Sequence, residues 1–347
     1  MVGEQASAIA GKLFETLSHK SLFLEKILKE EYAIFQDDLV TFDSYSEFFD
    51  TNVTVILTDK SISLLFDTHK RSNFIFQAKY TKHIPCNTLD KTLFLDKSVA
   101  KGLTQITNTA KPKQFKKTIK RLKKANLSSG LVSLFYGHPG TGKTASVYEL
   151  AKKTKRDILQ VDLSAIQSKW VGESEKNTRE IFNEYRRAKI ALKHEPILLF
   201  NEADGLLSKR LDISNPVGQM HNTMQNILLE ELENFEGIFI ATTNLIDNLD
   251  DAFSRRFLHK LEFPKPGANV KKKIWSAKIP QLSDEMIESL SHYDLTGGQI
   301  ENIAKRYMLE TILNDKELSL HELREYCETE VAFKREESGK RVGFCGD

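Results

Sequence analysis

The chain has 347 residues, of which 40% are hydrophobic and 28% are charged, and its formal net charge is +2. Such a composition is typical of a soluble globular protein, and the length suits two or three domains. The near-neutral net charge argues against a general nucleic-acid binder. The longest apolar runs, residues 53–57 and 197–200, are too short to span a membrane. With no signal-peptide pattern at the N-terminus, we expect a cytoplasmic protein without a membrane span.

The three cysteines, Cys86, Cys327 and Cys345, are scattered along the chain. They form no CxxC pair and have no histidine nearby at ligand spacing. We therefore expect neither a zinc site nor a disulfide framework.

Residues 1–110 contain no glycine-rich loop and no catalytic pattern. Apolar residues at helical spacing predict a long first helix; they are Ile9, Leu13, Leu17, Leu24 and Leu28. Strand-like runs follow at residues 53–57, 61–66 and 73–78. We expect an N-terminal accessory domain of mixed helix and strand over residues 1–110.

Residues 111–124 form a strongly basic stretch, KPKQFKKTIKRLKK. Phe115, Ile119 and Leu122 recur within it at helical spacing, which favours an amphipathic helix that packs its apolar face on the next domain and solvates its lysines. The alternative, that the stretch binds DNA or RNA, is less favoured but remains open.

Short apolar strands then alternate with helices, which indicates a parallel sheet covered by helices on both faces. The strands are expected at residues 131–136, 157–163, 196–200, 237–243 and 258–263, with helices from residue 143 and over 173–192. After Pro264 and Pro266 only helices are expected, among them residues 286–290, 298–313 and 318–333. The fold class is therefore α/β, with a large α/β domain over residues 111–265 followed by a small helical domain with the C-terminal tail over 266–347.

A P-loop lies between the first of these strands and the helix that follows it. The sequence GHPGTGKT comprises Gly137, His138, Pro139, Gly140, Thr141, Gly142, Lys143 and Thr144. Its glycines let the backbone aim N–H groups at phosphate oxygens, and the following helix presents its positive end. Lys143 is expected to reach the β and γ phosphates, and Thr144 is expected to bind magnesium, so ATP and Mg²⁺ are the predicted cofactors.

Asn201 and Glu202 follow the buried strand over residues 196–200. An acidic pair at this place would put one carboxylate on the water shell of magnesium and the other against the attacking water. Here the first position is asparagine, whose oxygen can still accept from a metal-bound water. Glu202 remains available to polarise the attacking water.

Over residues 111–333 the sequence resembles the AAA ATPases, and among them the clade of protein remodellers that includes katanin and spastin. SKWVGESEKNTREIF at 168–182 resembles the first pore loop and its helix, and ATTNLIDNLDDAFSRRF at 241–257 resembles the second region of homology. LTGGQIENIAKR at 295–306 is similar to the start of the lid helix. Asn201 departs from the family, which usually has aspartate there, and this predicts weaker magnesium binding with hydrolysis retained.

The resemblance implies further site residues. Asn244 would be sensor 1, whose amide bonds the γ phosphate and the lytic water, and Arg255 and Arg256 would act on the nucleotide of a neighbouring subunit. Gly298 would leave room near the base. The pore loop would be Lys169, Trp170 and Val171, with the tryptophan gripping an extended peptide.

These inferences predict an ATP-hydrolysing ring, a hexamer by resemblance, that remodels or threads a polypeptide through a central pore. Two alternatives remain open: a nucleotide-gated scaffold with weak hydrolysis, and a motor that acts on nucleic acid.

Overall fold

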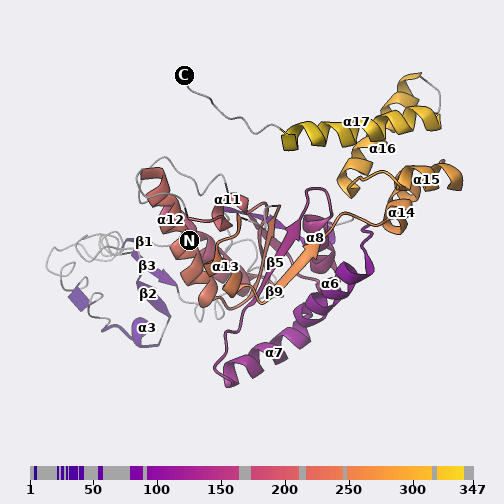
Figure 1. Cartoon of the computed structure of the whole chain (residues 1–347). Coiled ribbons are helices and arrows are strands. Elements are labelled where there is room, and N and C mark those ends of the chain that lie inside the picture. The colour runs from indigo at the N-terminus through magenta and orange to yellow at the C-terminus, as the bar shows by residue number, and fades with distance from the viewer. Residues whose placement is uncertain are drawn as a thin grey trace, which may run out of the picture. The chain divides into compact units, whose positions relative to one another are not determined.

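A computed structural model describes residues 4–5, 22, 25–26, 29, 31–37, 39–42, 54–57, 79–88, 92–163, 173–210, 216–244, 248–314 and 319–339 (Figure 1). The chain divides into two compact units. One comprises Met1–Lys79 with Arg186–Lys193, and the other comprises Tyr80–Tyr185 with His194–Asp347.

The first unit contains a three-stranded antiparallel sheet in the order β1-β3-β2. Its strands are β1 (Glu4–Gln5), β2 (Val40–Phe42) and β3 (Thr54–Leu57), and helix α3 spans Ala33–Gln36. Strand β3 confirms the strand predicted at residues 53–57. The five leucine and isoleucine positions of the predicted first helix, and the strands predicted at 61–66 and 73–78, lie outside the described residues.

The second unit is built on a six-stranded sheet in the order β4-β6-β7-β8-β5-β9. The strands are β4 (Thr81–Ile84), β5 (Leu131–Gly137), β6 (Ile158–Val161), β7 (Ile197–Phe200), β8 (Ile238–Thr243) and β9 (His259–Phe263). All neighbouring pairs are parallel except β4 with β6, which is antiparallel. The five strands predicted between residues 131 and 263 are confirmed.

Helices cover both faces of this sheet, because its central strands are apolar on both sides. On one face, α6 (Lys97–Ala110), α7 (Pro112–Lys124) and α8 (Lys143–Thr154) enclose a core with alternate strand residues, such as Ile197, Leu199 and Ile240. On the other face, Phe200 and Phe239 meet an aromatic cluster with Phe182 of α10 (Glu173–Ala191) and Phe235, which follows α12 (Pro216–Glu233).

The structure corrects the first predicted domain boundary, at residue 110. Strand β4 pairs with β6 from Thr81↔Val161 to Ile84↔Ile158, so residues 81–84 belong to the sheet. Glu184 of α10 fixes the start of β4, since its carboxylate accepts hydrogen bonds from the Tyr80 N–H at 3.0 Å and the Thr81 hydroxyl at 2.7 Å. The unit that contains the six-stranded sheet therefore begins at Tyr80.

Helix α7 confirms the amphipathic helix predicted over residues 111–124. Phe115 is 3% exposed, and Ile119 packs against the core beside α6 and α8. The buried guanidinium of Arg156 lies 5.0 Å from the centre of the Phe115 ring and donates from Nε to the Ala110 carbonyl at 2.8 Å. This contact fixes the corner between α6 and α7.

The lid consists of α14 (Ala268–Lys278), α15 (Asp284–Ser291), α16 (Gly297–Asn314) and α17 (Leu320–Gly339). The three predicted lid helices correspond to α15, α16 and α17, and α14 was not predicted. Trp275, Leu290, Ile300 and Leu323 are fully buried in a core of the lid's own. No helix within the described ranges is both long enough and apolar enough to cross a bilayer.

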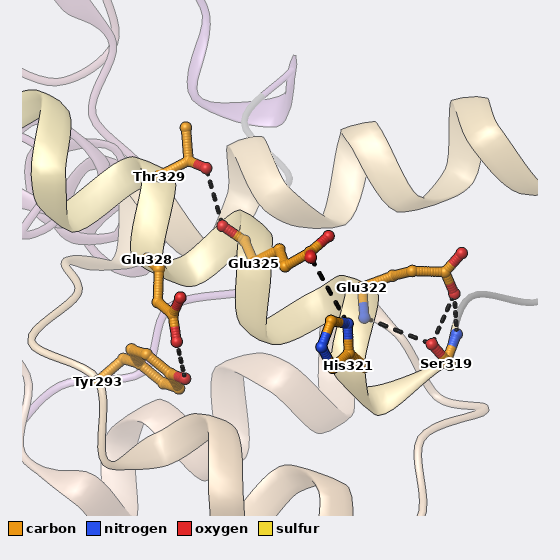
Figure 2. A network of polar contacts seen from close by, with 7 residues as sticks. All are labelled: Tyr293, Ser319, His321, Glu322, Glu325, Glu328 and Thr329. Carbon is orange, nitrogen blue, oxygen red and sulfur yellow. Dashed lines mark hydrogen bonds and ion pairs between the residues drawn. The ribbon is translucent and has the colours of Figure 1, made fainter.

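Helix α17 begins with a capping box (Figure 2). The Ser319 hydroxyl accepts from the Glu322 N–H at 3.3 Å, while Glu322 Oε2 accepts from the Ser319 N–H at 2.6 Å and from its hydroxyl at 2.7 Å. Further along, the Tyr293 hydroxyl donates to Glu328 at 3.2 Å, which ties α17 to the segment between α15 and α16. Burial raises the pKa of the Cys327 thiol to about 12, so this cysteine is unreactive.

Candidate functional site

The loop between β5 and α8 depends on glycine at three positions. Gly137, Gly140 and Gly142 have φ angles of 137°, 74° and 96°, a region that residues with a Cβ rarely adopt. A Cβ on Gly137 would also lie 2.2 Å from the Phe263 carbonyl oxygen of β9. The sequence GHPGTGKT therefore folds here as the predicted tight turn, and α8 begins at Lys143.

The Lys143 side chain folds back over this loop. Nζ donates hydrogen bonds to the carbonyl oxygens of Gly137 at 2.7 Å and His138 at 2.8 Å. Burial lowers the pKa of Lys143 to about 8, while the carboxylates of Asp204 and Glu202 oppose this shift. A partly desolvated ammonium group thus lies beside the loop's N–H groups, which suits an anionic ligand.

Asn201 and Thr144 are in direct contact. The Thr144 hydroxyl donates to Asn201 Oδ1 at 2.6 Å, and the Thr242 hydroxyl of β8 donates to the same oxygen at 3.1 Å. Two donors on one oxygen fix the orientation of the amide, with its oxygen toward the loop. Because the Thr144 hydrogen points to Asn201, the lone pairs of its hydroxyl remain free for a cation.

Glu202 follows with an unusual backbone conformation. Its φ is +55°, in the left-handed region, and its N–H donates to the Thr242 hydroxyl at 2.9 Å. This sharp turn directly after β7 brings the carboxylate to the edge of the sheet where the loop lies. The parallel strands place their carboxyl ends at this edge, which is the usual ligand-binding edge of such sheets.

Asp204 holds Asn244 in place, a function that our sequence analysis missed. Asp204 Oδ1 accepts from the Asn244 N–H at 2.8 Å and from the Thr243 hydroxyl, and Oδ2 accepts from Asn244 Nδ2 at 3.2 Å. The acid two residues after Glu202, on the same strand-end turn, was the available signal. Its partner lies 40 residues away, so the pairing could not be read from sequence.

A cavity of about 500 Å³ joins these residues. The predicted site residues that line it are Pro139, Gly140, Thr141, Gly142, Lys143, Thr144, Glu202, Asn244 and Gly298. The lining also includes the apolar side chains of Leu93, Phe94 and Ile274. The cavity thus combines a cationic group with apolar lining residues, as a nucleotide requires for its phosphates and its base.

The comparisons with known proteins agree with this geometry. A model of the ATPase family associated with various cellular activities (AAA) matches residues 133–265. Residues 133–265 are an AAA domain. They include most of β5, the loop, Asn201, Glu202, Asn244 and both predicted arginines.

Similar proteins carry this domain within longer chains. Over 160 residues the chain is 32% identical to fidgetin-like protein 1 of Drosophila melanogaster, covering 44% of this chain and 29% of that one. It is 34% identical over 185 residues to proteasome-activating nucleotidase 2 of Haloferax volcanii, covering 49% and 43%. It is 31% identical over 160 residues to a 26S proteasome regulatory subunit 6B homolog of Encephalitozoon cuniculi, covering 43% and 39%. The chain therefore spans less than half the length of each of these relatives.

The lid meets the AAA domain at two glycines. The Gly298 N–H donates to the Gly140 carbonyl at 2.9 Å, and a Cβ on Gly298 would lie 2.9 Å from Gly140 Cα. The first turn of α16 therefore reaches the loop only because both residues lack side chains.

The two predicted arginines do not line the cavity. Both end helix α13 (Asp251–Arg256). Arg256 is half-buried and pairs with Glu233 of α12 at 3.1 Å. Arg255 is exposed and has no hydrogen-bond or ion-pair partner among the described residues. The predicted pore residues Lys169, Trp170 and Val171 lie outside the described residues.

The donor set fits a magnesium ion bound with its nucleotide. Thr144 Oγ1 is a hard oxygen ligand of the kind that Mg²⁺ takes together with phosphate oxygens and waters, and Asn201 Oδ1, 2.6 Å from it, suits a contact to the ion through water. Elsewhere, the described residues hold no group of three or more His, Cys, Asp or Glu side chains that could bind a metal.

Proposed function

We propose that this AAA domain binds ATP with magnesium and hydrolyses it. The observation that carries the proposal is the convergence of Lys143, Thr144, Glu202 and Asn244 on one 500 Å³ cavity. These residues come from α8 and from the ends of β7 and β8, and their side-chain types match the needs of phosphoryl transfer.

Each residue has a distinct task in this scheme. The Lys143 ammonium exchanges its two carbonyl partners for phosphate oxygens and neutralises their charge. Glu202 accepts a hydrogen bond from the attacking water and orients it. Asn244, held by Asp204, contributes an amide toward the γ phosphate. Thr144 would hold the magnesium ion directly and Asn201 would hold it through water; when bound, the ion neutralises charge on the phosphates.

Steady-state phosphate release tests hydrolysis. We expect Glu202→Gln to reduce turnover by roughly 10²-fold or more, because the amide cannot take up a proton from water. The Glu202→Gln variant should keep its affinity for nucleotide, whereas Lys143→Ala should abolish nucleotide binding. Equal rates for wild type and Glu202→Gln would overturn the assignment.

We further propose that the chain works as a ring, hexameric by family resemblance. Arg255 supports this, because it is exposed, lacks a partner among the described residues and lies outside the cavity of its own chain. A guanidinium supplied by a neighbour stabilises charge in the transition state, an effect worth about 10³ to 10⁵ in rate in GTPases. Hydrolysis should then rise steeply with protein concentration as the ring assembles.

A polypeptide is the substrate that we propose, in the cytoplasm. Two of the relatives are named for the proteasome, and Trp170 lies in the predicted pore loop. A Glu202→Gln trap should retain ATP and client proteins together, and adding Trp170→Ala should release the clients. Clients that remain bound to the double variant would rule out gripping by Trp170.

Asn201 favours a second candidate, a scaffold that assembles on ATP and barely hydrolyses it. The neutral amide removes one negative charge next to Thr144. If wild type and Glu202→Gln released phosphate at the same negligible rate while both assembled with ATP, the scaffold would be the better account.

A further inference from the structure

Helices α6 and α7 carry an extreme charge imbalance. Ten basic residues and no acidic residue lie between Lys97 and Lys124. The net charge of the whole chain is +2, so subtracting this +10 leaves −8 for all the other residues. The two helices are consecutive and in contact, and Figure 1 shows them in purple, one after the other. We call their outer surface the α6–α7 basic surface.

The folding of α7 leaves these cations available. Phe115 and Ile119, on its apolar face, pack into the core, whereas every lysine and arginine of the helix is exposed. Only Lys123 has an acidic partner, Glu236, at 2.6 Å. The other nine basic residues between Lys97 and Lys124 have no acidic partner among the described residues; they are Lys97, Lys101, Lys111, Lys113, Lys116, Lys117, Lys120, Arg121 and Lys124.

The surface between these charges is rich in uncharged hydrogen-bonding groups. A shallow hollow along α6 and the start of α7 is lined by Lys101, Thr104, Gln105, Asn108, Thr109, Lys111 and Gln114. Its ammonium and amide groups are donors, and no carboxylate lies among them. Lysine, threonine, asparagine and glutamine are the side chains that contact nucleic-acid phosphates.

We propose that the α6–α7 basic surface binds the phosphodiester backbone of a nucleic acid. Nine of the ten cations are lysines, which act as point charges and do not offer the planar fork that reads guanine. The contact is therefore independent of base sequence. Each helix is about 20 Å long, the length of roughly six base pairs, so several phosphates can be contacted at once.

The same features weigh against other polyanionic partners. A membrane-binding helix inserts an apolar face, and none of the exposed large hydrophobic side chains of the described residues lies on α6 or α7. A specific acidic protein needs aromatic or other buried anchors at the centre of its interface, and Phe115, the only aromatic residue of the two helices, is buried.

Fluorescence anisotropy tests the proposal on the full chain without nucleotide. The probes are a labelled 20-base-pair duplex, a single strand of equal length, polyglutamate of matched charge, and vesicles containing anionic lipid. We expect binding to both nucleic acids with a linear fall of log K against log salt concentration. The triple variant Lys116→Gln, Lys117→Gln, Lys120→Gln should weaken duplex binding roughly tenfold or more at 0.1 M salt and reduce the slope by about 3.

A matched control removes three positive charges elsewhere, with Lys260→Gln, Lys272→Gln and Lys305→Gln. It should bind nucleic acid like wild type, and thermal unfolding verifies that both triple variants are folded. Equal losses in the two variants would show a response to net charge alone and overturn the proposal. So would salt-independent binding by wild type, tighter binding to polyglutamate or vesicles than to nucleic acid, or no binding to either nucleic acid.

Discussion

The Thr144 hydroxyl and the side-chain oxygen of Asn201 are joined by a hydrogen bond of 2.6 Å. Thr242 donates to the same oxygen, so the side-chain amide of Asn201 is held in one orientation. An aspartate at this position would keep both bonds and add a negative charge. The present site therefore has the geometry of a magnesium site with reduced charge.

We expect Asn201→Asp to lower the magnesium concentration that gives half-maximal turnover by roughly tenfold. Unit charges about 4 Å apart interact by about 4 kcal/mol at an effective dielectric of 20, and a contact through water is weaker. Phosphate release measured across a magnesium titration at fixed ATP gives the value. An unchanged magnesium dependence would contradict this account of Asn201.

Asp204 should matter for turnover without touching the substrate. Asp204→Ala removes the acceptor for both the Asn244 N–H and its side-chain amide, so the amide loses its fixed orientation. We expect kcat to fall roughly 10²-fold, as when one preorganised donor is lost, with little change in ATP affinity. Asn244→Ala should lower kcat by about the same factor. The double variant should lower kcat no further than either single change, since the two residues act as a unit.

A mixing experiment tests whether Arg255 acts on a neighbouring subunit. Lys143→Ala subunits cannot bind ATP but retain Arg255, whereas Arg255→Ala subunits retain an intact loop and cavity. Each preparation alone should be nearly inactive, and mixing them should restore part of the phosphate release. No recovery on mixing would favour a role within one chain. Arg256→Ala serves as the comparison, because its loss also breaks the ion pair with Glu233.

The pKa of Lys143, about 8, predicts a pH dependence of ATP binding. In the empty site the ammonium loses its proton above pH 8, whereas bound phosphates favour the charged form and raise the pKa. ATP binding should therefore take up a proton near pH 8, and affinity should fall above it by up to tenfold per pH unit. Because the unfolded chain binds more protons between pH 8 and 10.5, this group also makes the empty protein more stable as pH rises through that window.

Calorimetric titration of ATP at pH 7, 8 and 9, in buffers of different ionisation enthalpy, measures both affinity and proton uptake. Lys143→Arg keeps its charge throughout this range, so its affinity should be much less sensitive to pH. A wild-type affinity that stays level between pH 7 and 9 would contradict the lowered pKa.

The capping box of α17 predicts a local stability effect. Ser319→Ala removes the hydroxyl that accepts from the Glu322 N–H, and we expect it to lower the free energy of unfolding of the lid by about 1 kcal/mol. Urea unfolding followed by fluorescence reports it, since Trp275 is fully buried in the lid core. Thr329→Ala removes only a mid-helix hydroxyl bonded to the Glu325 carbonyl (Figure 2), so it should leave the midpoint nearly unchanged.

Features set by local sequence could be predicted. The loop at residues 137–144 needs glycines at fixed positions, and the central strands are apolar throughout. Both features could therefore be predicted from the sequence alone. Strand β4 was missed because three of the four residues of TKHI are polar. It is held as an edge strand by β6 and Glu184, far along the chain. Helix α6 was missed because threonine, asparagine and glycine weaken its helical signal.

In the candidate site, too, the residues set by local motifs could be predicted and the contacts between distant segments could not. Lys143, Thr144, Glu202 and Asn244 were predicted from motifs, and the structure brings them together around one cavity. The hydrogen bonds that orient them, donated by Asn244 to Asp204 and by Thr242 to Asn201, cross between the ends of β7 and β8. Such pairings depend on the order and register of the strands, which the local motifs do not reveal.

The left-handed backbone at Glu202 gives the site a cost in stability. A non-glycine residue at φ +55° is strained by roughly 1 kcal/mol, and glycine would relieve that strain while removing the carboxylate. Stability alone would therefore favour glycine at this position. Glutamate at this position therefore lowers the stability of the fold. A search for more stable variants of this protein should select early for replacement of Glu202, the residue that we assign to activating water.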